Sequence, residues 1–131
     1  MTESEMVNQA KEKFLQLNVG KIYLEVPIFS ASCDMLIYND ESGDIHAIEF
    51  KLKNWRQAIN QAARHKLAVD YCWICMPQVY QNVIEYAAKK QVGVLNLDGE
   101  FRLITDAPRN KTWEAERQRI IKSLNRRTYE P

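Results

Sequence analysis

The segment Asp44–Leu52 ends in an apolar run that two charged residues interrupt, because Glu49 and Lys51 alternate with Ile48, Phe50 and Leu52. Successive side chains of a β-strand point to opposite faces, so Glu49 and Lys51 would share one face, about 7 Å apart. Asp34 interrupts a second apolar run in the same way. The pattern predicts a sheet whose charged residues face a cleft while their neighbours form a core.

The first part of the chain predicts one helix followed by three strands. Thr2 and Glu5 fit a capping box that begins a helix ending near Asn18, with a buried stripe of Val7, Ala10, Phe14 and Leu17. Strands are expected at 21–29, 32–38 and 44–52. The polar turn at 39–43 is short, so the second and third strands should pair antiparallel.

The rest of the chain alternates helices and strands. Asn54 can cap a helix to about Ala68, and the almost wholly apolar run 71–76 is typical of a central strand, paired in parallel with the strand at 44–52. A helix at 78–91, a hairpin around Asp98-Gly99 and a helix at 112–126 follow. This order predicts an α/β fold, a three-layer α/β/α sandwich with a mixed central sheet, in one domain of residues 1–131.

Size and composition limit the class of protein. A chain of 131 residues with 46% hydrophobic content suits a single domain with a substantial core. No apolar run reaches the roughly 18 residues that span a bilayer, so no membrane association is expected. The three cysteines show no disulfide spacing, which suits a reducing compartment, and we expect a cytoplasmic protein.

The net charge of +1 hides an uneven distribution along the chain. Residues 1–49 carry nine acidic and three basic side chains, whereas residues 50–131 carry eight acidic and fifteen basic ones. No acid occurs between Phe50 and Val69, a segment with five lysines or arginines. Such a segment could follow the phosphates of a nucleic acid, or it could form solvated helix faces without a partner.

These residues together resemble the PD-(D/E)XK nuclease superfamily, which has a restriction-endonuclease-like fold. Asp34 matches the aspartate of the family motif, with Cys33 in place of the proline, and Glu49-Phe50-Lys51 matches the E-x-K element. Gln61-Ala-Ala-Arg-His65 is similar to the Q-x-x-x-Y/H helix motif of one branch. The resemblance covers about residues 2–77 and implies an αβββαβ core, here followed by a hairpin and a helix.

The resemblance implies a metal-dependent deoxyribonuclease, and we expect an endonuclease, although the motifs alone do not separate endo from exo cleavage. Its metal would be Mg²⁺, with Mn²⁺ as a substitute, bound by Asp34, Glu49 and the Phe50 carbonyl, since Mg²⁺ prefers hard oxygen ligands. Lys51 would be a fixed cation beside the scissile phosphate, and Gln61 would position water or phosphate. A first-helix glutamate, Glu5 or alternatively Glu12, would complete the catalytic set.

The expected partner is DNA, with RNA left open, and the expected DNA-binding residues are Lys53, Arg56, Arg64 and His65. A homodimer or a larger nuclease complex is a further possibility for a chain this small. Two alternatives remain at this stage. Asp34, Glu49 and Lys51 could form a buried structural salt bridge, or the fold could be a catalytically silent module that binds nucleic acid or a protein.

Overall fold

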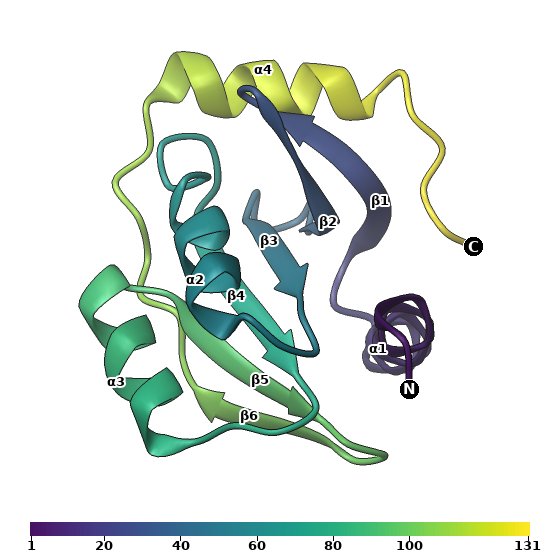
Figure 1. The fold of residues 1–131 in the computed structure, drawn as a ribbon. Coiled ribbons are helices and arrows are strands. Elements are labelled where there is room, and N and C mark those ends of the chain that lie inside the picture. The colour runs from purple at the N-terminus through teal and green to yellow at the C-terminus, as the bar shows by residue number, and fades with distance from the viewer.

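The computed structural model describes residues 1–131 as one mixed α/β unit with four helices and six strands (Figure 1). In chain order these elements are α1 Glu3–Leu17, β1 Lys21–Ile28, β2 Ala31–Tyr38, β3 Ile45–Phe50, α2 Trp55–Ala63, β4 Tyr71–Met76, α3 Gln81–Lys90, β5 Gly93–Leu97, β6 Phe101–Thr105 and α4 Glu114–Leu124. The predicted order of elements and the mixed α/β class are confirmed. No helix has the length and apolar composition needed to cross a membrane.

The six strands form one sheet in the order β1-β2-β3-β4-β5-β6. The pairs β1/β2, β2/β3 and β5/β6 are antiparallel, while β3/β4 and β4/β5 are parallel, as expected when a helix connects the paired strands. The motif strand β3 therefore lies in the middle of the sheet, beside the equally central β4.

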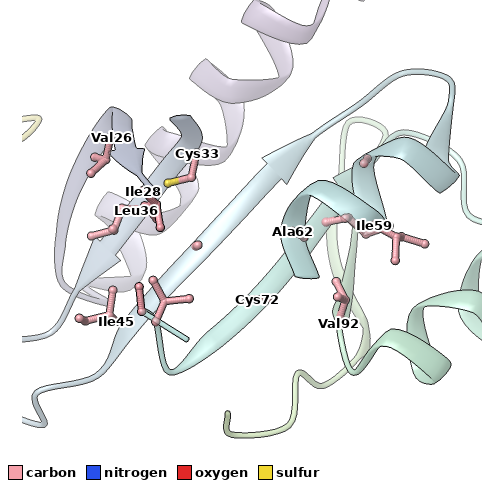
Figure 2. Close-up of a cluster of buried hydrophobic side chains, with 14 of the residues drawn as sticks. Val26, Ile28, Cys33, Leu36, Ile45, Ile59, Ala62, Cys72 and Val92 are labelled. Carbon is pink, nitrogen blue, oxygen red and sulfur yellow. The ribbon is translucent and has the colours of Figure 1, made fainter. Parts of the chain in front are cut away.

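Two hydrophobic cores lie on the two faces of the sheet. The larger includes Leu36, Ile45 and Ile59, and it is covered by α2, α3 and α4. Figure 2 shows Ile59 and Ala62 of α2 among the buried side chains of this core. The smaller core joins Met6, Ala10 and Phe14 of α1 to the opposite face. Helices on both faces give the predicted three-layer sandwich.

Helix termini show where local prediction was right and where it was wrong. The capping box is present, since the Thr2 hydroxyl accepts from Glu5 N and Glu5 Oε1 accepts from Thr2 N, both at 3.1 Å. The buried stripe is Met6, Ala10 and Phe14, whereas Val7 is half-buried and Leu17 is 53% exposed, so the predicted stripe was right only at Ala10 and Phe14. Asn54 lies in the left-handed region with φ 55° and makes no side-chain cap, so that prediction was wrong.

A buried carboxylate that the sequence did not indicate attaches α4 to the sheet. Asp70, 4% exposed, accepts from Ile45 N at 2.8 Å and from Arg117 Nε at 3.2 Å. Arg117 also donates to the Gly43 carbonyl, and Arg109 Nη1 lies 3.6 Å from Asp70 Oδ1. A buried charge is tolerated when its oxygens are hydrogen-bonded and paired with a cation, as they are here.

We predict that Asp70→Ala lowers the free energy of unfolding by about 3 kcal/mol, because it leaves the buried Ile45 N–H and the Arg117 guanidinium without their partner. Urea denaturation followed by circular dichroism measures the change. Asp98→Ala is the matched control, since it removes an exposed carboxylate whose partners are Arg102 at 3.7 Å and the Glu100 N–H at 3.4 Å, and it should cost less than about 0.5 kcal/mol. Equal losses in the two variants would contradict the structural role of Asp70.

Candidate functional site

Strands β2 and β3 stop pairing at Asp34, and this separation forms the site. Their register runs from Tyr38↔Ile45 to Met35↔Ile48 and goes no further. Beyond it, Phe50 N donates to Asp34 Oδ2 at 2.8 Å, so a side-chain carboxylate takes the place of a backbone acceptor. On the other side of β2, Glu25 interrupts the β1 ladder with φ 53°, which is uncommon for a residue with a side chain. Asp34 is therefore held at an opening in the sheet.

Glu49 lies on the α2 side of this opening, in contact with a histidine. His65 Nε2 lies 2.9 Å from Glu49 Oε1, and the two residues are 1% and 4% exposed. Burial lowers the pKa of His65 to about 4, so the imidazole is neutral, and with its proton assigned to Nε2 it donates to the Glu49 carboxylate. Nδ1 then has no hydrogen-bond partner. The ring fixes the orientation of Glu49 at the cost of one unsatisfied buried atom.

The two carboxyl groups carry strongly shifted pKa values. Burial raises the pKa of Asp34 to about 7, and the charge of Glu49 adds to the shift. Burial likewise raises the pKa of Glu49 to about 7, although hydrogen bonds with Asp34 oppose the shift. Two acids that resist ionisation in a protein without metal form a place where a cation would be stabilised.

Lys51 follows β3 directly, and its N–H donates to the Cys75 carbonyl at 3.2 Å, which holds the backbone against β4. No ion pair within 4.0 Å joins Lys51 to Asp34 or Glu49; the side chain within that distance of Glu49 is the neutral imidazole of His65. The alternative of a buried Asp34–Glu49–Lys51 salt bridge is therefore wrong. The Lys51 side chain is half-buried, and its charge is among the groups that lower the pKa of Glu49, after burial and the Asp34 hydrogen bonds in size.

A cleft of about 280 Å³ opens onto Asp34 from the α1 side, and its wall includes Phe50. The glutamate that α1 supplies there is Glu3, whose Oε2 accepts from Leu52 N at 3.3 Å. Glu5 is occupied by the capping box, and Glu12 lines a separate open pocket beside Gly99, so the structure brings neither to Asp34. Glu3 was not predicted as the first-helix glutamate of the site, because the capping-box pattern favoured Glu5.

On the other face, α2 carries a polar groove of about 430 Å³, here called the α2 groove, lined by Asn54, Arg56, Gln57, Asn60, Gln61 and Arg64. Gln61 lines this groove and makes no hydrogen bond with Asp34 or Glu49. Lys53 is exposed next to it. His65 was expected to bind DNA, but it is buried against Glu49 and cannot reach a ligand, because the helical stripe of Ala58 and Ala62 turns it inward.

The donor set at the opening fits a hard divalent cation. Asp34 and Glu49 each use one oxygen in a hydrogen bond, with Phe50 N and His65 Nε2 respectively, and each has a second oxygen. The structure holds no group of three or more His, Cys, Asp or Glu side chains arranged for a metal. Two carboxylates are sufficient for Mg²⁺, which usually keeps several waters, whereas Zn²⁺ needs a fuller set of side chains.

Comparisons with solved structures identify two similar folds. A protein of unknown function from Silicibacter pomeroyi has a TM-score of 0.74 and 17% identity, over 96% of this chain and 86% of that one. A repair endonuclease from Pyrococcus abyssi has a TM-score of 0.62 and 21% identity, over 76% of this chain and 48% of the endonuclease. At these identities the likeness concerns the fold. No protein-family model matches the chain, and no curated protein sequence matches it either.

The raised pKa values predict a specific dependence of stability on pH in the metal-free protein. A carboxyl group whose pKa is about 7 when folded and 3.8 when unfolded disfavours folding as the pH rises between these values. Asp34→Asn keeps an acceptor for Phe50 N and removes the charge. It should therefore raise the free energy of unfolding at pH 8 in EDTA by about 1–2 kcal/mol, after allowing for solvent screening.

The increase in the free energy of unfolding caused by Asp34→Asn should become smaller as the pH falls from 8 to 4.5, because wild-type Asp34 is already protonated in the folded state at the lower pH. Urea denaturation at a series of pH values measures it. Glu41→Gln removes an exposed acid from the turn before β3 and serves as the control, with no expected dependence of this size. A destabilised Asp34→Asn protein at pH 8 would show that the carboxylate contributes to stability and is not held under strain.

Proposed function

We propose that this protein is a Mg²⁺-dependent nuclease that hydrolyses DNA phosphodiester bonds at the opening between β2 and β3. The observation that carries the proposal is the convergence of half-buried Asp34 and buried Glu49, two acids with pKa values near 7 and no lysine or arginine within 4.0 Å. A structural ion pair would have a cationic side chain at that place, as Asp70 has. The fold is similar to that of a repair endonuclease, which supports the same class of reaction.

The proposed ion would be held by Asp34, Glu49 and the Phe50 carbonyl, with Mn²⁺ as a substitute. When bound, Mg²⁺ supplies charge neutralisation at the phosphate and a more acidic water. The chain's own residues orient this centre. Phe50 N fixes Asp34, and His65 fixes Glu49 by donating from Nε2 while staying neutral. Partners that hold ligand oxygens in place typically raise the affinity for the metal by about 10- to 100-fold.

Lys51 is the proposed electrostatic catalyst. Its backbone is fixed against β4, the residue is half-buried, and its charge acts on Glu49, whose pKa it lowers. A cation held there would stabilise the negative charge that develops on the scissile phosphate, and a partly desolvated setting strengthens that interaction. We propose DNA as the substrate, because the basic segment after Phe50 lies beside this centre. The proposed location is the cytoplasm.

Purified protein is expected to cleave DNA with Mg²⁺ or Mn²⁺ and to be inactive in EDTA. Lys51→Ala should reduce the cleavage rate at least about a hundredfold, since it removes a preorganised charge at the transition state. Lys13→Ala is the control, because it removes a lysine that lines the open pocket beside Gly99 and not the cleft at Asp34. Gel analysis of linear and circular DNA separates end-directed from internal cleavage, and inactivity of the wild type on every DNA form would refute the proposal.

Metal binding gives an independent measurement. Isothermal titration calorimetry should detect Mg²⁺ binding to the wild type and a loss of affinity of at least about tenfold in Asp34→Asn and in Glu49→Gln. Glu12→Gln is the control, since Glu12 lies in a pocket away from Asp34. Binding that is equal in all four proteins would mean that the ion is held elsewhere, and it would favour a silent binding module.

A further inference from the structure

We infer that the α2 groove, extended onto α3 by Tyr86 and Lys90, binds the backbone phosphates of one DNA strand beside the cleavage site. The inference rests on the proposed function for the identity of the ligand. It goes further in assigning a binding surface to residues that have no part in the metal centre, including two on a helix outside the motif region.

The chemistry of the groove indicates an anionic ligand rich in hydrogen-bond acceptors. All six lining residues are amides or arginines, and none is hydrophobic or acidic. A surface that binds a folded protein usually has an apolar centre, which this groove lacks. Guanidinium and amide donors without competing carboxylates suit phosphate and sugar oxygens.

One of the two arginines is preorganised by aromatic rings. The Arg56 guanidinium carbon lies 5.2 Å from the centroid of Trp55 and 4.9 Å from that of Tyr86. Lys90 Nζ lies 5.6 Å from the same Tyr86 ring, and the Tyr86 hydroxyl donates to Asn60 Oδ1 at 2.8 Å. Stacking against rings limits the freedom of a long side chain and leaves its outer N–H groups available for a ligand.

The groove is placed where a strand leaving the metal centre would pass. It begins at Asn54, three residues after Lys51, and reaches Arg64, the residue before His65, which contacts Glu49. Eight residues separate Arg56 from Arg64, about 12 Å along a helix. Since the phosphates of one duplex strand advance about 3.4 Å each along the axis, the two arginines would contact phosphates about three nucleotides apart.

The test is DNA binding measured apart from cleavage. A fluorescently labelled 20-base-pair duplex is titrated with full-length protein in EDTA, and anisotropy is recorded at several salt concentrations. Removing two phosphate contacts should lower the slope of log affinity against log salt by about 2. We expect this for the double variant Arg56→Ala with Arg64→Ala, with a similar loss of affinity on duplexes of unrelated sequence.

Lys13→Ala combined with Lys122→Ala is the matched control. It removes the same charge from exposed or open positions of α1 and α4 and should leave the slope unchanged. Arg56→Lys keeps the charge but loses the planar stacking group, so the slope should persist while affinity falls severalfold. Thermal denaturation confirms that each variant is folded.

Three results would overturn the inference: no DNA binding by the wild type at low salt, an unchanged slope in the arginine double variant, or an equal change in the control. The first would assign the groove to an acidic protein surface. Failure of the nuclease proposal is distinguishable, because a protein that never cleaves DNA can still show the predicted slopes. Conversely, cleavage with unchanged slopes would leave the nuclease proposal intact and refute the groove.

Discussion

The hydrogen bond from Phe50 N to the Asp34 carboxylate is the contact around which the rest of the site is arranged. A central strand cannot leave a backbone N–H unpaired in the interior, so β2 and β3 could separate only where a side chain supplies the acceptor. Asp34 does this and keeps its second oxygen. The separation exposes Asp34 to the cleft beside α1 while Glu49 stays directed to α2.

The chain contains two kinds of carboxylate at buried or half-buried positions, and the contrast between them is informative about function. Asp70 is contacted by two arginines and a backbone N–H, a complete set of partners that stabilises the attachment of α4. Asp34 and Glu49 have hydrogen-bond donors but no lysine or arginine within 4.0 Å, and burial raises their pKa values to about 7. A fold gains nothing from charges held in this way unless a cation joins them, which is the physical basis of the proposed metal centre.

The fold followed from the sequence to a large extent, because its signals are local. The charges that interrupt the apolar run at the end of β3, the uniformly apolar β4 and the turn residues between strands determined the topology, and β1 to β4 lie within two residues of their expected bounds. The site was less predictable. Sequence spacing brought Asp34 and Glu49 together, but it could not show that His65 faces inward or that Glu3, not Glu5, reaches the cleft, since both depend on how helices pack on the sheet. The burial and pairing of Asp70 could not be predicted, because its partners are distant in the sequence.

The uneven charge along the chain becomes a difference between the two faces of the sheet. Glu3, Glu25 and Asp34 make the α1 cleft acidic, whereas Arg56 and Arg64 make the α2 groove basic. A polyanion is repelled by the first surface and attracted by the second, while a divalent cation has the opposite preference. Under the proposed function, metal and DNA would therefore approach the opening between β2 and β3 from opposite sides. Glu49 and Lys51, at the end of β3, are the residues at which the two would meet.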